Sequence, residues 1–369
     1  MKIMILAGDA RTLLYFREEM ILAMLDKGHE VIAAAPQPIG EWAGKFSFQR
    51  KGFKCLSLPQ IDKTGTNPFK DILGFFSIMR VLQREKPDKI FTYQAKTIIY
   101  GTLAAWFLGI EEVYILMGGL GSILRNEKKS MIKKILQLQY KLAFKKCKKV
   151  FFQNADDYNL MLQEGLVETE RVQMVKGSGV NMDKFTYTPI QDFPVFLFVG
   201  RLIRDKGVLE YIAAAKLVKK RYPEAKFQIV GYFDTNPTAL SPEEFHSCLD
   251  DGLIEYLGEA ADVRPFLAKS SVFVLPSYHE GIPKSVLEAM AMGRPIITTD
   301  APGCKDTVID GVNGFLVPVK NSEKLAEKMI WMIENKDKAM KMGQASVRIC
   351  QENFEVSKVN EVLLKTMNL

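Results

Sequence analysis

Residues 195–207, with the sequence VFLFVGRLIRDKG, are the stretch that decides the fold. Five consecutive apolar residues are typical of a strand buried on both faces of a parallel sheet, and the glycine that follows marks a turn toward a helix. A polar segment that contains proline, residues 186–194, precedes the stretch and interrupts the pattern before it. We therefore place a domain boundary between residues 188 and 189.

Short apolar runs alternate with helical patterns on both sides of this boundary. In the first part, strands are expected at residues 2–7, 31–35, 54–58, 89–93, 113–116, 150–153 and 172–175. In the second part, strands are expected at residues 195–199, 227–230, 254–257, 272–275, 296–299 and 314–317. This alternation predicts an α/β protein with two Rossmann-like domains, residues 1–188 and 189–353. A helical pattern at residues 354–369 is expected to pack back on the first domain.

Cysteine usage and hydropathy exclude several classes of protein. The five cysteines are far apart and form no C-x-x-C pair, which favours a reducing cytoplasm over a disulfide framework or a zinc site. The N-terminus enters a strand-like run without the cleavage pattern of a secretory signal. The longest nearly apolar run, residues 98–110, is shorter than the roughly 18–20 residues that cross a bilayer, so we interpret it as a buried helix.

The net charge of +7 lies in the first domain. Residues 1–187 contain 28 basic and 19 acidic residues, a net +9, whereas residues 188–369 contain 22 and 24, a net −2. Residues 125–149 hold ten basic residues and one acid, interleaved with large apolar residues at helical spacing. Two interpretations of this amphipathic basic helix stay open, a segment that docks on an anionic membrane and a core-packed helix with a solvated lysine face.

Two carboxylates stand eight residues apart in residues 276–288, PSYHEGIPKSVLE, which follow the apolar strand 272–275. Glu280 lies in the loop, and Glu288 lies about one turn inside the helix that follows. The N–H groups at a helix start attract anions, whereas carboxylates accept hydrogen bonds from sugar hydroxyls. The segment therefore favours a site for a nucleotide sugar, with incidental surface acids as the alternative.

A companion motif, residues 200–207, supplies two cations at the turn after the strand 195–199. Arg201 offers a planar fork and Lys206 a compact charge, and together they suit a diphosphate leaving group. Basic residues at a helix start are often merely solvated, so this motif gains its meaning from the Glu280 segment.

These two motifs resemble those of the retaining glycosyltransferases of the GT-B fold, specifically their large fourth sequence family. The likeness covers nearly the whole chain and includes residues 177–181, GSGVN, before the linker. It implies two facing Rossmann-like domains with an interdomain cleft, the first binding the acceptor and the second the nucleotide sugar.

The resemblance also implies a role for each matching residue. The family residues that match Arg201 and Lys206 hold the donor diphosphate. The residue that matches Glu280 binds the donor sugar, and the residue that matches Glu288 binds the ribose. Arg201, Lys206 and Glu280 are thus the candidate catalytic residues. Further donor-binding candidates are Gly8 and the backbone of Gly281, Ile282, Pro283, Lys284 and Ser285. Asp9, beside Gly8 in a reduced glycine-rich loop, is either a contact or a turn residue.

A narrower likeness, to transferases that extend undecaprenyl-diphosphate-linked sugars (N-acetylgalactosaminyltransferase type), comes from four short stretches. These are residues 118–122 (GGLGS), 152–157 (FQNADD), 262–265 (DVRP) and 299–304 (TDAPGC). It suggests a UDP-linked N-acetylhexosamine such as GalNAc as donor. The acceptor would be a polyprenyl-diphosphate-linked saccharide in bacterial surface polysaccharide or glycan assembly.

The chain also departs from the family. Many members carry a histidine after the fourth strand, where this chain has LMGGL at residues 116–120. Its three histidines, His29, His246 and His279, lie elsewhere, and no general base is assigned. A retaining front-face displacement, in which the leaving phosphate takes the acceptor proton, needs no such base. No D-x-D pair is present, so we expect no metal and no cofactor.

Three other functions are weighed against this hypothesis. A dinucleotide-dependent oxidoreductase would need G-x-G-x-x-G after a strand, and GGLG at residues 118–121 has the wrong spacing. A nucleic-acid binder would need aromatics within the basic stripe. A UDP-sugar epimerase or hydrolase of the same fold remains the alternative. We expect a cytoplasmic enzyme held peripherally on the inner face of the plasma membrane through residues 125–149.

Overall fold

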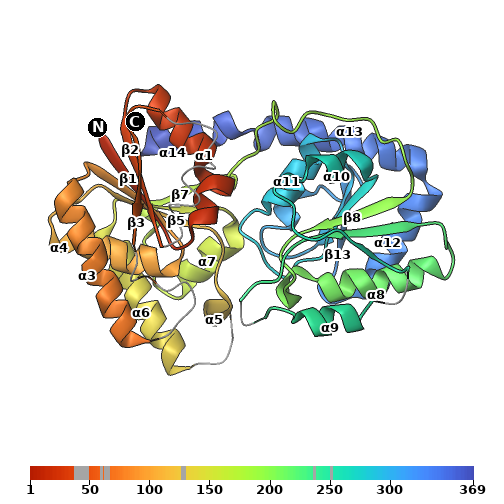
Figure 1. Cartoon of the computed structure of the whole chain (residues 1–369), viewed down its shortest axis with the longest axis horizontal. Coiled ribbons are helices and arrows are strands. Elements are labelled where there is room, and N and C mark those ends of the chain that lie inside the picture. The colour runs from red at the N-terminus through yellow and green to blue at the C-terminus, as the bar shows by residue number, and fades with distance from the viewer. Residues whose placement is uncertain (37–49, 59–60, 62–66, 126–129, 236–237, 250–251) are drawn as a thin grey trace. The chain divides into compact units, whose positions relative to one another are not determined.

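The computed structural model describes all residues except 37–49, 59–60, 62–66, 126–129, 236–237 and 250–251 (Figure 1). The described residues form two compact units. Unit 1 comprises Met1–Ser178 and Val359–Leu369, and unit 2 comprises Gly179–Lys358. The sequence placed the corresponding boundaries at residues 188/189 and 353/354.

Unit 1 is an α/β unit. Its strands are β1 (Lys2–Ala7), β2 (Glu30–Ala35), β3 (Phe53–Ser57), β4 (Lys89–Tyr93), β5 (Val113–Met117), β6 (Lys149–Phe152) and β7 (Val172–Met174). Its helices are α1 (Ala10–Asp26), α3 (Pro68–Glu85), η1 (Thr97–Gly101), α4 (Thr102–Phe107), α5 (Ser122–Arg125), α6 (Met131–Lys146), α7 (Ala155–Gln163) and η2 (Thr169–Arg171). The strands form one parallel sheet in the order β3-β2-β1-β4-β5-β6-β7.

Two buried clusters cover the two faces of this sheet, because successive side chains of a strand point to opposite faces. On β1, Met4 and Leu6 belong to the cluster that includes residues of α3, α4 and α6. Ile3 and Ile5 belong to the other cluster, which includes residues of α1. The strand is therefore apolar and buried at every position except its first, Lys2.

The helix α14 (Val356–Thr366) contributes to the second of these clusters (Figure 1). Val359, Leu363, Leu364 and Met367 are buried there with residues of α1 and β1. The Lys27 ammonium, after the end of α1, also donates to the Leu369 carbonyl at 2.9 Å. Residues at the C-terminal end of the sequence thus complete the core of the N-terminal unit.

The apolar run 98–110 is only partly buried, which corrects the interpretation of it as a buried helix. It forms a single π-helical turn, η1, followed by α4. Ile98 and Ile99 are buried, but Trp106 and Phe107 at the end of α4 are exposed. An apolar run alone does not reveal that two of its aromatic side chains, Trp106 and Phe107, are exposed to solvent.

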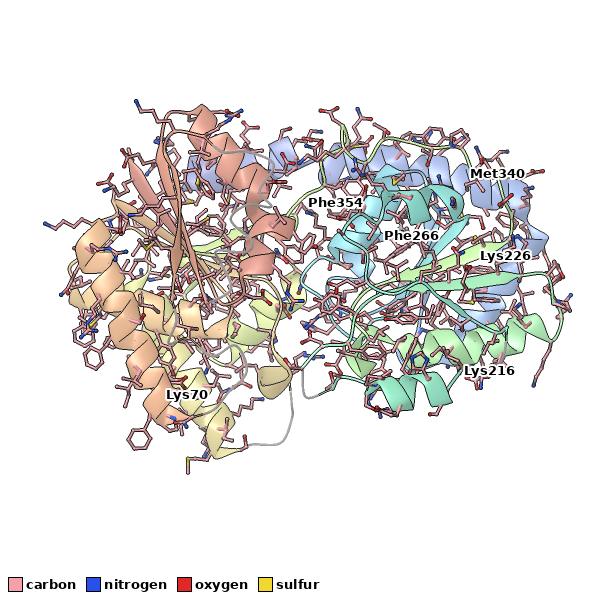
Figure 2. All side chains as sticks on the ribbon, viewed as in Figure 1. Lys70, Lys216, Lys226, Phe266, Met340 and Phe354 are labelled. Atoms are coloured by element: carbon pink, nitrogen blue, oxygen red, sulfur yellow. The ribbon has the colours of Figure 1, made fainter. Side chains whose placement is uncertain are left out.

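Unit 2 repeats the architecture. Its strands are β8 (Val195–Val199), β9 (Lys226–Val230), β10 (Glu255–Tyr256), β11 (Val272–Leu275), β12 (Ile296–Thr299) and β13 (Gly314–Val317). Its helices are η3 (Arg204–Lys206), α8 (Val208–Lys219), α9 (Pro242–Ser247), α10 (Arg264–Lys269), α11 (Lys284–Ala291), η4 (Lys305–Thr307), α12 (Ser322–Glu334) and α13 (Lys336–Asn353). The parallel sheet has the order β10-β9-β8-β11-β12-β13. The strand expected at residues 254–257 is shortened to β10, and Lys226 opens β9 at the surface (Figure 2).

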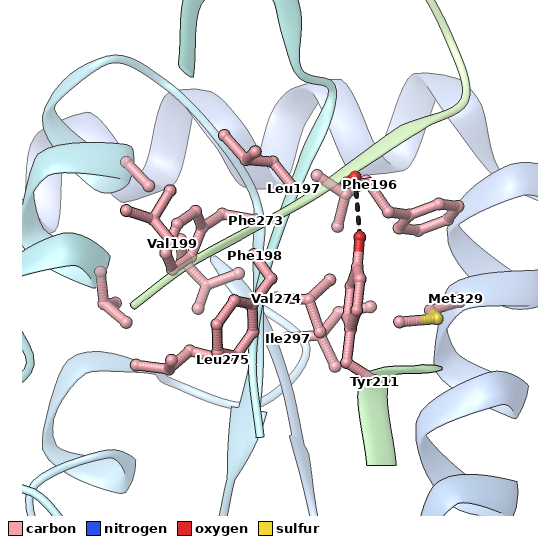
Figure 3. Close-up of a cluster of buried hydrophobic side chains, with 14 of the residues drawn as sticks. Phe196, Leu197, Phe198, Val199, Tyr211, Phe273, Val274, Leu275, Ile297 and Met329 are labelled. Atoms are coloured by element: carbon pink, nitrogen blue, oxygen red, sulfur yellow. Dashed lines mark hydrogen bonds between the residues drawn. The ribbon is translucent and has the colours of Figure 1, made fainter. Parts of the chain in front are cut away.

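The core of unit 2 is built on β8 and β11, whose residues are all buried (Figure 3). Tyr211 of α8 lies fully buried in this cluster, and its hydroxyl donates to the Phe196 carbonyl of β8 at 2.8 Å. A buried phenol needs such a partner, because an unpaired hydroxyl in an apolar core costs free energy. The two sheets confirm the predicted α/β domains with parallel sheets. Among the described residues, no helix is long and apolar enough to span a membrane.

We expect Leu363→Ala to destabilise unit 1 by about 2–5 kcal/mol, because it opens a cavity where α14 packs on the sheet. The measurement is urea unfolding, with hydrogen exchange of the β1 amides as a readout of unit 1. Val362→Ala, a half-exposed neighbour on the same helix, is the matched control and should change stability by about 0.5 kcal/mol or less. Equal effects of the two variants would show that α14 does not support this core.

Candidate functional site

The order of the unit 2 sheet reverses between β8 and β11, and this reversal positions the candidate residues. Chain segments that leave the carboxyl ends of two such strands diverge, and ligands of open parallel sheets bind at that point. Both motifs singled out from the sequence, residues 200–207 and 276–288, follow these two strands. The fold therefore brings them to the same sheet edge.

Backbone contacts hold the two loops against each other. The Tyr278 N–H donates to the Asp205 carbonyl at 2.8 Å. Gly207 has a φ of 71°, and a Cβ at this position would lie 2.1 Å from the Pro276 carbonyl oxygen. Only glycine permits this approach, because any side chain would push the loops apart.

Lys206 and Glu280 form an ion pair across these loops. The Lys206 ammonium lies 2.5 Å from Glu280 Oε1, and the Ser277 hydroxyl lies 2.7 Å from the same oxygen. Burial alone would raise the pKa of Glu280, but Lys206, Ser277 and the charge of Arg201 outweigh burial, so this pKa lies below its ordinary value. Glu280 is thus an ionised hydrogen-bond acceptor at neutral pH and holds no proton to donate.

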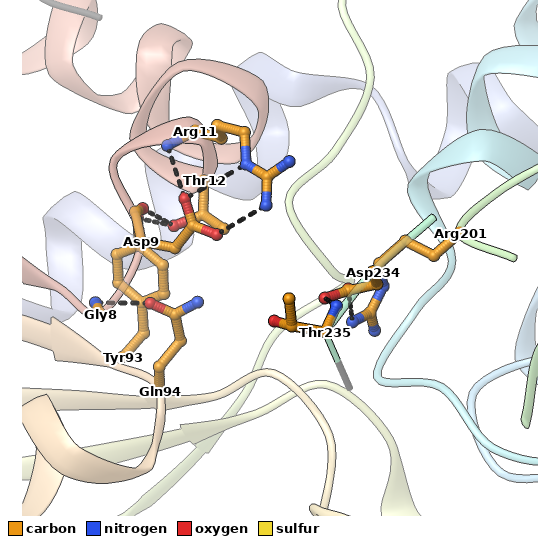
Figure 4. A network of polar contacts seen from close by, with 9 residues as sticks. All are labelled: Gly8, Asp9, Arg11, Thr12, Tyr93, Gln94, Arg201, Asp234 and Thr235. Carbon is orange, nitrogen blue, oxygen red and sulfur yellow. Dashed lines mark hydrogen bonds and ion pairs between the residues drawn. The ribbon is translucent and has the colours of Figure 1, made fainter. Parts of the chain in front are cut away.

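Arg201 pairs with a residue that the sequence did not single out. Its guanidinium donates to the Asp234 carboxylate at 2.8 Å, and the side chain of Asp234 is 3% exposed (Figure 4). Asp234 follows β9, the neighbour of β8 in the sheet. An acid after the strand adjacent to the arginine motif was the available signal. The side chain of Arg201 is 35% exposed, so it remains accessible to an anion.

Glu288 lies one turn inside α11, which begins at Lys284. Burial raises the pKa of Glu288 to about 7, opposed in part by the charge of Lys284. Among the described residues, none forms a hydrogen bond or an ion pair with this carboxylate. A half-buried carboxylate of this kind is costly to the fold and is typical of a group that awaits a hydrogen-bonding ligand.

The loop 281–285 connects Glu280 to α11 and is braced by the segment after β12. The Glu280 N–H donates to the Pro302 carbonyl at 2.9 Å. A Cβ at Gly303, whose φ is 75°, would lie 2.1 Å from the Gly281 carbonyl oxygen. Ile282 and Pro283 are buried, and Lys284 and Ser285 open the helix. The partial positive charge of the α11 N-terminus therefore lies next to Glu280 in the chain.

Gly8 and Asp9 lie in unit 1, at the equivalent reversal between β1 and β4. The Gly8 N–H donates to Gln94 Oε1 at 2.6 Å. The Asp9 carboxylate accepts from the Arg11 N–H at 2.9 Å and caps α1 (Figure 4). Of the two interpretations of Asp9, the structure shows the turn residue. Its sequence signal was the position of an acid directly before a helix.

We expect Glu288→Gln to stabilise the protein at pH 8 and to have little effect at pH 5. The raised pKa means that the folded state retains a proton which the unfolded state releases at lower pH, so wild-type stability falls as pH rises toward 7. After solvent screening we expect a gain of about 1–2 kcal/mol at pH 8, measured by urea unfolding. Glu352→Gln, on the exposed side of α13, is the control for removing one carboxylate. A gain that is equal at both pH values would contradict this account of Glu288.

Comparison with known proteins agrees with this architecture. A family model described as glycosyl transferase 4-like matches residues 4–154, and one described as glycosyl transferases group 1 matches residues 193–335. The N,N'-diacetylbacillosaminyl-diphospho-undecaprenol alpha-1,3-N-acetylgalactosaminyltransferase of Campylobacter jejuni is 30% identical over 351 residues, which cover 91% of this chain and 90% of that protein. The UDP-Gal:alpha-D-GlcNAc-diphosphoundecaprenol alpha-1,3-galactosyltransferase of Escherichia coli is 25% identical and covers 72% of each chain.

Solved structures share the fold over the whole chain. Anabaena HepE in complex with UDP gives a TM-score of 0.75 with full coverage of both chains at 16% identity. Sucrose-phosphate synthase from Thermosynechococcus elongatus gives 0.80 at 17% identity, over 100% of this chain and 98% of that structure. The motifs at the edge of the unit 2 sheet, the two family matches and the Campylobacter relative lead to one assignment: the chain is a glycosyltransferase of the group 1 and 4-like family, with the GT-B fold.

Proposed function

We propose that this enzyme transfers an N-acetylhexosamine, such as GalNAc, from a UDP-sugar to a polyprenyl-diphosphate-linked saccharide. The observation that carries the proposal is the pairing of Lys206 with an ionised Glu280 where the unit 2 sheet reverses. The names of the Campylobacter and Escherichia relatives support the lipid-linked acceptor, and that of the Campylobacter relative supports the donor sugar. The role is one step in the assembly of a bacterial surface polysaccharide or glycan.

Arg201 and Lys206 hold the donor diphosphate in this proposal. Each charge-assisted hydrogen bond contributes roughly 1.5–3 kcal/mol, and the contribution grows as the departing UDP gains negative charge. Asp234 and Glu280 keep the two cations ionised and oriented before the donor binds. Because the positive charge comes from side chains, we propose a reaction that needs no metal ion and no cofactor.

Glu280 and Glu288 bind hydroxyl groups of the donor. The ionised Glu280 accepts hydrogen bonds from the sugar, and Glu288 accepts them from the ribose. Backbone groups of residues 281–285, at the start of α11, complete the sugar and phosphate site. Gly8 is a further donor-binding candidate from the sequence, and its N–H donates to Gln94.

The transfer retains the configuration of the anomeric carbon. The bond from this carbon to the phosphate oxygen breaks while the acceptor hydroxyl forms the new glycosidic bond on the same face. The hydroxyl proton passes to the departing phosphate oxygen, so UDP leaves with that proton. Glu280 is not the base in this proposal, because Lys206 and Ser277 stabilise its ionised form and lower its pKa, which makes it a weak proton acceptor.

The lipid-linked acceptor requires the enzyme to work at a membrane surface. We assign this attachment to residues 125–149 and place the enzyme peripherally on the inner face of the plasma membrane. Ten basic residues support the assignment, since each lysine or arginine near an anionic surface contributes about 1 kcal/mol. Such attraction weakens with salt.

The direct test uses a panel of labelled UDP-sugars with and without a polyprenyl-diphosphate saccharide. We expect label in the lipid product with an N-acetylhexosamine donor, unchanged by excess EDTA, and an anomeric NMR coupling that matches the donor. UDP release without acceptor would identify a hydrolase, and a changed donor sugar an epimerase. A loss of activity restored by Mg²⁺ or Mn²⁺ would contradict the metal-free reaction, and an inverted coupling would contradict retention.

Variants of the donor site separate the proposed roles. Arg201→Ala and Lys206→Ala should each reduce transfer by about 10- to 150-fold, the equivalent of one charge-assisted contact. Glu288→Gln should weaken UDP binding in calorimetry, whereas Glu280→Gln should weaken binding of the UDP-sugar more than that of UDP. Arg204→Ala is the matched control, because Arg204 lies in the same turn but pairs with the exposed Glu244. Near-normal turnover of the Arg201 or Lys206 variant, with an unchanged melting temperature, would refute the diphosphate assignment.

A further inference from the structure

Three helices of unit 1 present large apolar side chains to solvent. We call these side chains the apolar surface. It comprises Phe69, Ile72, Leu73 and Phe76 of α3, Trp106 and Phe107 of α4, and Met131, Ile132, Ile135, Leu138 and Leu142 of α6. Phe69 is 79% exposed, Phe107 63% and Met131 72%. A concentration of exposed aromatic and aliphatic side chains on neighbouring elements marks an interaction surface.

The exposed residues of α3 form a stripe opposite its buried face. Phe69, Ile72, Leu73 and Phe76 have the spacing i, i+3, i+4, i+7, which places them on one side of the helix. The residues that reach the core lie half a turn away, at 78, 81, 82 and 85. The helix is thus apolar on two opposite sides, and packing in unit 1 accounts for only one of them.

The helix α6 shows the same arrangement. It reaches the core through Tyr140, Ala143 and Phe144. Leu136 packs partly against the core, whereas Met131, Ile132, Ile135, Leu138 and Leu142 are exposed and lie mainly on the opposite side. The outer side of α6 therefore carries large apolar residues as well as lysines.

Ring contacts join the three helices into one surface. The rings of Phe75 in α3 and Phe107 in α4 meet edge to face with centroids 5.9 Å apart. The Lys146 ammonium of α6 lies 4.0 Å from the centroid of the Trp106 ring in α4. These contacts show that α3 and α6 each lie against α4, so the three helices present their exposed apolar side chains as neighbours.

The charge beside this area selects the partner. The exposed Lys134, Lys141 and Lys145 flank the apolar stripe of α6, and this helix contains no acidic residue. Lys70 lies at the start of α3 (Figure 2). In a symmetric dimer through this surface the lysines would face each other and repel. Apolar side chains flanked by lysines are instead complementary to a bilayer with anionic headgroups.

We propose that the apolar surface of α3, α4 and α6 inserts into one leaflet of an anionic membrane. The inference deepens the proposed function, on whose lipid-linked acceptor it rests in part. It adds insertion of apolar side chains from three helices to electrostatic attraction by residues 125–149. It thereby assigns the side of unit 1 that faces the lipid, which is the side with the exposed apolar residues of α3, α4 and α6.

The test is flotation with vesicles of phosphatidylcholine and phosphatidylglycerol at low and high salt. We expect wild type to float at low salt and to retain part of its binding at high salt, since apolar insertion resists screening. The variant Phe69→Gln/Ile72→Gln/Phe76→Gln should lose at least tenfold in binding and become fully salt-sensitive. Lys134→Gln/Lys141→Gln/Lys145→Gln should lose its preference for phosphatidylglycerol.

The matched control is Ile309→Gln/Val312→Gln/Val319→Gln, which removes three exposed apolar residues of unit 2 and should float like wild type. Brominated lipid should also quench a part of the tryptophan emission that Trp106→Phe removes. Equal flotation of the α3 variant and wild type, at unchanged melting temperature, would overturn the proposal. So would a wild type that does not float and dimerises in sedimentation velocity through the apolar surface.

Failure of the inference is distinguishable from failure of the proposed function. With a short-chain, water-soluble diphosphate acceptor the α3 variant should transfer sugar at the wild-type rate, whereas with a vesicle-embedded acceptor its rate should fall. Flotation and quenching need no transfer, so they test the surface even if the chain uses no polyprenyl acceptor.

Discussion

The candidate site of unit 2 depends on the close approach of two loops at Gly207. The loop after β8 carries Arg201 and Lys206, and the loop after β11 carries Glu280. The sheet brings the two loops to the same edge, but only a residue without a side chain lets the first loop touch the Pro276 carbonyl. Lys206, the neighbour of Gly207, then lies within reach of Glu280. The strand order brings the two loops to the same edge of the sheet, and the absence of a Cβ at Gly207 allows them to touch.

Charge balance explains how this site is stable without a ligand. Asp234 and Glu280 compensate the two cations, so neither cation bears an uncompensated charge in a partly buried place. Glu288 is the exception, because its half-buried carboxylate has no hydrogen bond from any described residue. The site thus combines two satisfied ion pairs with one unsatisfied acceptor. A ligand whose hydroxyl groups donate hydrogen bonds can satisfy Glu288 without displacing another residue from it.

The sequence predicts much of the fold because strand formation depends on local apolar runs. Each expected strand is present, with bounds that differ by at most one residue, and the strand at residues 254–257 shortens to the two residues of β10. Glu280, Lys206 and Glu288 are recognisable because they follow strands in motifs. Asp234 escapes detection, because its role depends on the pairing of β9 with β8 and no local pattern records that pairing.

The sequence also does not predict which side of an amphipathic helix packs against the core. The apolar pattern of residues 125–149 predicts an amphipathic helix, but a pattern does not say which side of the helix the core takes. In α6 the core takes the side of Tyr140 and Phe144 and leaves the other apolar side to solvent. The outcome depends on the shape of the neighbouring layer, which forms only when the whole unit folds.

The position of α14 on unit 1 has a consequence for biosynthesis. A ribosome completes residues 1–178 long before residues 359–369 emerge, so the face of the sheet that α14 covers stays open while all of unit 2 is made. Unit 1 needs Val359, Leu363 and Met367 to complete its core. The unit that is translated first therefore completes its core last.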